Sequence, residues 1–370
     1  MTRVLHVQKV SGVSGSEAHL LALLPGLREL GLDAEMLVLH EGEPGAAEFV
    51  RAMRDASVPT SSMRMRLVVD PLVFARLLRR RADIVHTHLV HADVLALPAA
   101  ALARVPIRVS TKHGFNEFRE SRAIAAVDRF AARFAQRQIA ISHGLARYLA
   151  KTQGYRDDAF TVVHYGIAAG SEPPPPPRAP RLTAVGRLIP IKGLDVLLDA
   201  FARARADVPG LTLELAGDGP LEAELRAAAP DGVTLLGRVA PVAQVYERNA
   251  IVVVPSRGEG FGMVALEAAE RGRAAIVSDV GGLPEIVEDG RTGLVVPPED
   301  AGALAAAIVA LARDFERVAA FGAAARQRAL DQFTSSAATE GVARVYREEL
   351  EKRSTAAAAS STSRKSNGTR

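Results

Sequence analysis

The chain has 370 residues, of which 48% are hydrophobic and 24% are charged, as in an ordinary globular protein. Its formal charge is +4, but three positive charges lie in an acid-free terminal tail (Arg364, Lys365 and Arg370), so the remainder carries only +1 and does not favour nucleic acid as a partner. The absence of cysteine excludes disulfides and thiol chemistry. No apolar run approaches the ~20 residues that a membrane-spanning helix needs.

Strands and helices alternate through the first half of the chain. Short apolar runs predict strands at 4–7, 36–39, 84–86, 107–110, 138–141 and 160–164. Helical patterns lie between several of them, at 17–30, 71–81, 92–104 and 117–137. This alternation predicts an α/β domain, 1–167, with a doubly wound parallel sheet.

A proline-rich stretch, 168–180, interrupts this pattern. Its run of five prolines favours an extended, semi-rigid spacer, so we interpret it as a linker between two domains. The alternation restarts in a second domain, 181–333. Strands are expected at 182–185, 212–216, 233–235, 251–254 and 274–277, and helices at 194–206, 263–270, 301–311 and 315–331. A last helix is expected at 334–352. The Ala/Ser/Thr-rich segment 354–370 is predicted to be disordered because it cannot form a core.

The segment 251–296 carries the strongest chemical pattern. A buried strand leads into a loop with Gly258, Gly260 and Gly262, and a helix follows from Met263. Glycines permit close backbone approach to a ligand, and the first N–H groups of a helix suit a phosphate. Ligands of parallel sheets bind at the carboxyl ends of the strands, where this loop lies.

Two carboxylates flank the same loop. Glu259 and Glu267 are separated by seven residues. Carboxylates beside a phosphate site are suited to accept hydrogen bonds from sugar hydroxyls, so the pattern indicates a nucleotide sugar. The alternative is that Glu259 caps the helix and Glu267 is a solvated surface residue.

The stretch EGFGMVALE, from Glu259 to Glu267, resembles the E-x7-E signature of retaining GT-B glycosyltransferases, in particular the GT4 family. The resemblance continues through VGRLIPIKG, AGDGP, LGRV and SDVGGLPEIVEDGRTGLVV and covers nearly the whole chain. It implies the GT-B fold, with two Rossmann-like domains facing across a cleft. The donor is then expected mostly on the second domain and the acceptor on the first, with the last helix crossing back to the first domain.

Arg187 and Lys192 frame a turn at the carboxyl end of a predicted strand, where their charges suit a diphosphate. The alternative is that both are ordinary surface cations. No Asp-x-Asp motif is present, so we expect no metal and no cofactor. The resemblance implies a catalytic set of His113, Glu259, Arg187 and Lys192. The implied donor-binding set is Gly15, Arg187, Lys192, Arg238, Val239, Glu259, Gly260, Phe261, Gly262, Met263, Val264 and Glu267.

Histidines cluster after two strands of the first domain. A neutral imidazole at His113 suits a hydrogen bond from a donor sugar hydroxyl, and the resemblance places it near the 6-hydroxyl; a structural role is the alternative. His86, His88 and His91 are spaced so that they could present ligands to zinc, but no nearby cysteine and no convincing acid to orient their rings accompany them, and roles in lining the cleft or packing the sheet are expected. Ser14 departs from the family pattern, which usually has glycine there, as does His164-Tyr165-Gly166-Ile167.

These observations predict a retaining, metal-independent glycosyltransferase. The resemblance implies transfer from a UDP- or GDP-sugar to a lipid-linked glycan or a small-molecule acceptor, in polysaccharide or glycolipid synthesis in the cytoplasm. A nucleotide-sugar epimerase and an inactive sugar-nucleotide binding module are the alternatives. If 117–137 is a helix, Arg122, Arg129 and Arg133 form one stripe, and Ile124, Val127, Ala131 and Phe134 form a separate apolar stripe. The arginine stripe indicates either contact with an anionic membrane surface or an ordinary surface helix whose apolar side faces the core.

Overall fold

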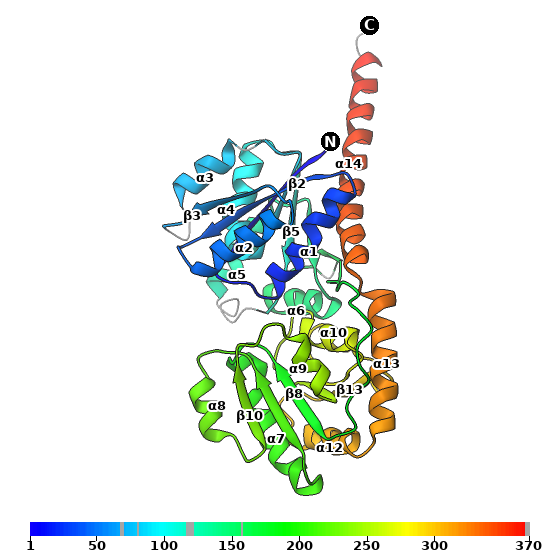
Figure 1. Cartoon of the computed structure of the whole chain (residues 1–370). Coiled ribbons are helices and arrows are strands. Elements are labelled where there is room, and N and C mark those ends of the chain that lie inside the picture. Colours follow the sequence, from blue (N-terminus) through cyan, green and yellow to red (C-terminus); the bar gives the residue numbers. More distant parts are fainter. Residues whose placement is uncertain (67–69, 80, 116–121, 157, 367–370) are drawn as a thin grey trace. The chain divides into compact units, whose positions relative to one another are not determined.

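The computed structural model describes residues 1–66, 70–79, 81–115, 122–156 and 158–366. The chain forms two compact units (Figure 1). The first unit comprises residues 1–141, 146–164 and 335–370, and the second comprises 142–145 and 165–334. Among the described residues, no helix is both long enough and apolar enough to cross a membrane.

The first unit contains a seven-stranded parallel sheet in the order β3-β2-β1-β4-β5-β6-β7. Its strands are β1 (Arg3–Lys9), β2 (Asp33–His40), β3 (Thr60–Arg64), β4 (Ile84–His88), β5 (Ile107–Lys112), β6 (Arg137–Ala140) and β7 (Phe160–Val162). The strand order reverses between β1 and β4, so their carboxyl ends flank the crevice where doubly wound sheets bind ligands.

Helices cover both faces of this sheet. They are α1 (Gly15–Glu29), α2 (Pro44–Asp55), α3 (Pro71–Leu78), α4 (Leu89–Leu102), α5 (Arg122–Ala132), α6 (His143–Gln153) and α14 (Ser335–Ser366). α14 packs on α1, where a Cβ atom at Gly26 would lie 2.8 Å from the Thr339 hydroxyl. Tyr346 of α14 is fully buried in the core of this unit.

The second unit contains a six-stranded parallel sheet in the order β10-β9-β8-β11-β12-β13. Its strands are β8 (Arg181–Val185), β9 (Thr212–Ala216), β10 (Val233–Gly237), β11 (Ile251–Val254), β12 (Ala274–Ser278) and β13 (Gly293–Val296). Its helices are α7 (Leu194–Asp207), α8 (Glu222–Ala228), α9 (Ala243–Arg248), α10 (Met263–Glu270), α11 (Leu283–Ile286), α12 (Ala301–Ala312) and α13 (Phe315–Gln332). The two all-parallel sheets confirm the predicted α/β fold class.

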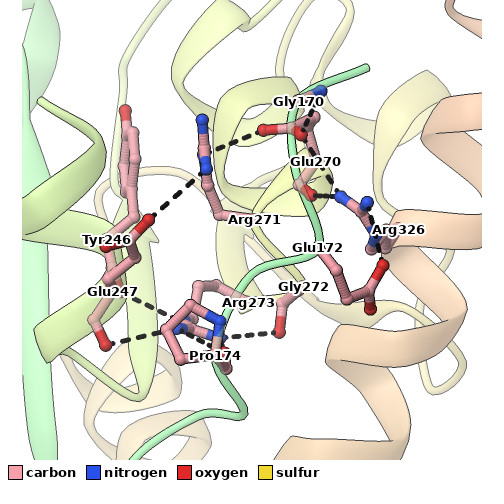
Figure 2. Close-up of polar contacts among 10 residues, drawn as sticks. All are labelled: Gly170, Glu172, Pro174, Tyr246, Glu247, Glu270, Arg271, Gly272, Arg273 and Arg326. Carbon is pink, nitrogen blue, oxygen red and sulfur yellow. Dashed lines mark hydrogen bonds and ion pairs between the residues drawn. The ribbon is translucent and has the colours of Figure 1, made fainter.

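The proline-rich segment, interpreted from its composition as an extended linker, is hydrogen-bonded to the second unit. Arg273 is only 1% exposed, and both of its terminal nitrogens donate to the Pro174 carbonyl at 3.0 Å (Figure 2). The Gly170 N–H donates to the Glu270 carboxylate at 2.9 Å. Proline has no N–H to satisfy and an ordinary carbonyl acceptor, so an extended proline run can be held through its carbonyls alone.

Seven of the described elements were not predicted, namely β3, α2 and α6 in the first unit and α8, α9, α11 and β13 in the second, and one element extends further than expected. β3 is an edge strand with only Met63 buried, so its sequence lacks the apolar alternation of a strand. α2 and α6 were also missed, although α2 buries Ala46, Phe49, Val50 and Met53 at helical spacing. The segment from Ser354 continues α14 through Ser366 instead of being irregular. Alanine-rich sequence readily propagates a helix that packing has already nucleated.

A buried ion-pair cluster ties two helices to the first sheet. The Lys112 ammonium of β5 lies 2.6 Å from the Asp93 carboxylate of α4 and 2.7 Å from the Asp128 carboxylate of α5. All three side chains are fully buried. The Ser110 hydroxyl also donates to Asp93, at 2.9 Å. The cluster therefore fixes how α4 and α5 are rotated against the sheet.

Lys112→Met is expected to destabilise the first unit by about 3–5 kcal/mol, because it leaves two carboxylates buried without their cation. Lys352→Met is the matched control, since the Lys352 side chain is 59% exposed and its pair with Glu349 should contribute no more than about 1 kcal/mol. The measurement is urea unfolding followed by circular dichroism. Equal unfolding midpoints for the two variants would contradict the role assigned to the cluster.

Candidate functional site

The strand order of the second sheet reverses between β8 and β11, and three of the predicted donor residues, Arg187, Lys192 and Glu259, lie in the two loops that follow these strands. Arg187 and Lys192 follow β8, while Glu259 follows β11. Because β8 and β11 pair in parallel, their carboxyl ends meet at the same edge of the sheet. Lys192 and the first carboxylate of the E-x7-E pattern are thus brought together from positions 67 residues apart.

Lys192 and Glu259 are in direct contact. The Lys192 Nζ lies 2.5 Å from Glu259 Oε2, and the two side chains are 24% and 17% exposed. Arg187 is exposed at the same edge, and Arg238 is exposed just after β10, farther along the sheet, with Val239 half-buried beside it. Within the described part of the chain, neither arginine forms an ion pair. The site therefore combines one neutralised lysine with two arginines whose charge is available to an anion.

Arg257 connects the two loops. Its guanidinium donates to both Asp195 carboxylate oxygens, at 2.9 and 2.7 Å, and to the Pro190 carbonyl at 2.6 Å. Its Nε donates to Glu299 at 2.9 Å. Hydrogen bonding to Asp195 raises the pKa of Arg257 further above its usual value, and Arg257 in turn lowers the pKa of Asp195. This contact holds the turn after β8 against the glycine loop after β11.

The glycine loop and the start of α10 have the backbone geometry that the sequence predicts. Gly262 has a φ of 112° at the N-cap of α10, and a Cβ there would lie 2.6 Å from Leu283 Cδ2. The first N–H groups of α10 follow at Met263 and Val264, which are half-buried. Phe261 is buried, and the Gly260 carbonyl accepts a hydrogen bond from the Ser142 hydroxyl at 2.6 Å.

Glu267 lies one turn into α10 and has a buried partner. The Tyr246 hydroxyl of α9 donates to Glu267 Oε2 at 2.7 Å, and Tyr246 is only 1% exposed. Burial raises the pKa of Glu267, and the hydrogen bond from Tyr246 partly opposes this shift. The alternative of a freely solvated Glu267 does not fit this contact. One carboxylate oxygen is held by the protein, which fixes the orientation of the other.

The first unit contains the other two predicted residues. His113 follows β5 and is half-buried, with its Nε2 2.8 Å from Nδ1 of His88. Gly15 is exposed at the first position of α1. Ser14, which stands where the family pattern has glycine, is the N-cap of α1, and its N–H donates to the Glu17 carboxylate at 3.0 Å. Ser14 therefore stabilises the start of α1, whereas a glycine at this position would add backbone freedom.

The sequence did not predict Tyr246, Arg257 or Ser142, each of which supports a predicted residue. Arg257 stands inside the glycine-loop motif and could have been selected as a cation next to Glu259. Tyr246 and Ser142 carry no such signal, because their partners are 21 and 118 positions away in the sequence. Both roles depend on packing between elements that the sequence pattern does not pair.

The state of Glu267 leads to a prediction about stability and pH. Because the pKa of Glu267 is raised above the unfolded value of about 4.3, the folded chain binds this proton more tightly, and stability falls as pH rises through that interval. Glu267→Gln removes the titrating carboxyl group and with it this loss of stability. Its unfolding temperature relative to wild type is therefore expected to increase between about pH 4.5 and pH 8. Differential scanning fluorimetry measures this difference, with the exposed Glu224→Gln as control. A relative unfolding temperature independent of pH would contradict the buried state of Glu267.

Both units of the chain match known protein families. A family described as Glycosyltransferase Family 4 matches residues 13–170, and one described as Glycosyl transferases group 1 matches residues 179–314. The second match includes Arg187, Lys192, Glu259 and Glu267.

Curated relatives show the same relationship. The chain is 33% identical to a glycogen synthase of Mycobacterium tuberculosis over 290 residues, which cover 72% of this chain and 69% of the relative. It is 30% identical to an alpha-maltose-1-phosphate synthase of Mycolicibacterium smegmatis over 306 residues, which cover 72% of this chain and 79% of the relative.

Solved structures share the fold. HepE of Anabaena, determined with UDP and glucose, superposes with a TM-score of 0.82 at 22% identity and covers 94% of this chain and 100% of its own. A sucrose-phosphate synthase of Thermosynechococcus elongatus superposes with a TM-score of 0.76 at 20% identity, over 95% of this chain and all of its own. Taken with the identity to relatives over most of their length, these matches show that the chain belongs to the family 4 glycosyltransferases and has the GT-B fold.

Proposed function

We propose that the chain transfers a sugar from a nucleoside diphosphate sugar to an acceptor hydroxyl, with retention of the anomeric configuration and without a metal ion. The observation that carries this proposal is the contact between Lys192 and Glu259 beside the start of α10. A diphosphate at this place meets Arg187, Lys192 and the helix N–H groups. The sugar hydroxyls meet Glu259, and the ribose meets the Glu267 oxygen that Tyr246 leaves available.

The proposed reaction breaks the bond between the sugar C1 and the diphosphate oxygen and forms a bond between C1 and the acceptor oxygen on the same face. The acceptor proton passes to the departing diphosphate. No side-chain nucleophile is required, so the protein contributes by positioning the donor and by stabilising the charge that develops on the diphosphate. The chain has no Asp-x-Asp motif, and Arg187 and Lys192 supply the positive charge that a divalent ion would otherwise provide.

The structures of HepE with UDP and with UDP-glucose support a uridine nucleotide as the first donor to test. Wild-type protein with UDP-glucose, oligosaccharide acceptors and excess EDTA is expected to release UDP and form a glycosidic product with the donor's anomeric configuration. Arg187→Ala and Lys192→Ala are each expected to lower kcat/KM by about 10²–10³-fold, as when one stabilising donor is lost from a developing negative charge. Nucleotide release and NMR of the product measure these outcomes.

Arg181→Ala is the matched control, because Arg181 is exposed at the opposite end of the same strand, β8. Activity of the Arg187 and Lys192 variants within threefold of wild type would contradict the diphosphate site. Loss of activity in EDTA with rescue by Mn²⁺ would contradict metal independence. Conversion of the donor to its epimer, or binding without turnover across UDP- and GDP-sugars, would instead favour the epimerase or the binding module.

We further propose that α5 brings the first unit to an anionic membrane surface, where a lipid-linked acceptor would be presented. Val127 and Phe130 are 48% and 57% exposed, Arg129 is exposed on the same helix, and Arg133 is exposed in the turn just after it. The sequence had placed Val127 on the core-facing side. The buried Asp128–Lys112 ion pair turns the neighbouring residue outward instead. Arg119 lies outside the described residues, as does the side chain of Arg122. Exposed apolar residues beside arginines match a lipid interface.

Phe130→Ser is expected to weaken binding to phosphatidylglycerol vesicles about tenfold, because a phenylalanine buried in lipid contributes roughly 1.5–3 kcal/mol. Binding of the wild type should also fall as salt rises. Co-sedimentation measures both effects. Leu102→Ser is the control, since Leu102 is 68% exposed at the end of α4 in the same unit. Equal binding by the two variants, or no wild-type binding at low salt, would leave α5 as an ordinary surface helix.

A further inference from the structure

A chain of hydrogen-bonded rings runs through the interior of the first unit and ends at His113. His6 of β1 has its Nδ1 2.9 Å from Nε2 of His88, at the end of β4. His88 Nδ1 lies 2.8 Å from Nε2 of His113. At the other end, the Tyr346 hydroxyl of α14 lies 3.4 Å from His6 Nε2 and 2.5 Å from Nδ1 of His86. His6, His86 and Tyr346 are completely buried, and His88 is 1% exposed.

The geometry of the cluster favours shared protons over a bound metal. His6, His86 and His88 each offer a ring nitrogen within 4.8 Å of the others, which is close enough to consider an ion. Two nitrogens bound to one tetrahedral zinc at 2.0–2.1 Å lie about 3.3 Å apart. The His6–His88 separation of 2.9 Å is shorter than this and is a normal hydrogen-bond length. A proton therefore accounts for the contact without an ion.

All the buried rings are neutral. Burial lowers the pKa of His6 to about 3 and those of His86 and His88 well below the usual value, with neighbouring histidines adding to the shift. Burial also raises the pKa of Tyr346, so its hydroxyl keeps its proton. A neutral imidazole has one N–H donor and one acceptor nitrogen. Each ring that accepts on one side must therefore donate on the other, and the tautomers of the whole chain are coupled.

Tyr346 decides the direction of the chain. Its one proton can be donated to His86 Nδ1, at 2.5 Å, or to His6 Nε2, at 3.4 Å. A separation of 2.5 Å lies in the range of O–H donors and is shorter than the 2.7–3.2 Å typical of N–H donors, so the hydroxyl donates to His86, whose Nε2–H then donates to the Thr111 hydroxyl at 2.6 Å. His6 is left to donate from Nε2 to the Tyr346 oxygen and to accept at Nδ1 from His88.

We propose that Tyr346, acting through His6 and His88, fixes His113 in the tautomer that carries its proton on Nε2 and its lone pair on Nδ1. His88 donates from Nε2 to His6 and so accepts at Nδ1, where His113 Nε2–H is the donor. Tyr346, His6 and His88 are positioning residues in this scheme. This scheme gives Nδ1 of His113 the character of a hydrogen-bond acceptor, and its consequence for catalysis rests on the proposed function.

The test is long-range ¹H–¹⁵N NMR of the full chain labelled at histidine, without any donor, with His113 assigned through a His113→Gln variant. The wild type is expected to show a protonated Nε2 and an unprotonated Nδ1 at His113. In Tyr346→Phe the two ¹⁵N shifts should move toward each other, because both tautomers become populated. Tyr155→Phe is the control, since its hydroxyl contacts Asp128 at 3.3 Å in the same unit but does not contact the chain of rings.

A wild-type His113 protonated on Nδ1 would overturn the proposal, whether or not the Tyr346 variant folds. Shifts identical in wild type and folded Tyr346→Phe would also overturn it, as would one equivalent of zinc in the purified protein with loss of the pattern on chelation. If UDP-sugar transfer occurs, Tyr346→Phe should lower kcat/KM about fivefold, the value of one neutral hydrogen bond. The NMR measurement needs no turnover. It therefore tests the tautomer of His113 even if the protein does not have the proposed function.

Discussion

The candidate donor site depends on Arg257, which holds together the two loops that carry its charged residues. Its ion pairs with Asp195 and Glu299 are partly exposed, so each contributes little to stability. These contacts fix geometry, because the planar guanidinium donates hydrogen bonds to both oxygens of Asp195 and to the Pro190 carbonyl at once. Lys192 and Glu259 therefore approach each other on loops that are already braced.

Local patterns allowed the fold class and the donor loops to be predicted. Both sheets are parallel and built from apolar runs, and periodicity detects such runs without knowledge of their partners. The positions of Glu259, Glu267, Arg187 and Lys192 follow from strand ends and from the family resemblance. The cluster of histidine rings could not be predicted, because its contacts arise only when the elements pack together. The ring chain joins His6 to His88 across 82 positions and Tyr346 to His86 across 260, so it depends on strand register and on the docking of α14.

The errors in the sequence prediction share one cause, because in each case a neighbouring element overrides the local composition. The composition of the proline-rich segment does not reveal that the buried Arg273 binds the Pro174 carbonyl. Val127 looks like a core residue until the buried Asp128 fixes the rotation of α5. A buried cation needs acceptors and a buried carboxylate needs a cation, and these requirements outweigh the preferences of single residues.

The histidine rings of the first unit and the Lys192–Glu259 pair of the second offset the cost of burying polar groups in different ways. This difference bears on the choice of donor. The first unit places neutral rings on β1 and β4, so the cluster carries no charge to be screened or competed for. The second unit places a half-buried ion pair, Lys192 with Glu259, in the loops after β8 and β11. Under the proposed function, phosphate alone would compete with Glu259 for Lys192, and a free sugar would hydrogen-bond to Glu259 without supplying an anion for the lysine. A ligand that carries a diphosphate next to sugar hydroxyls compensates both partners in one step, which favours a nucleotide sugar over either fragment.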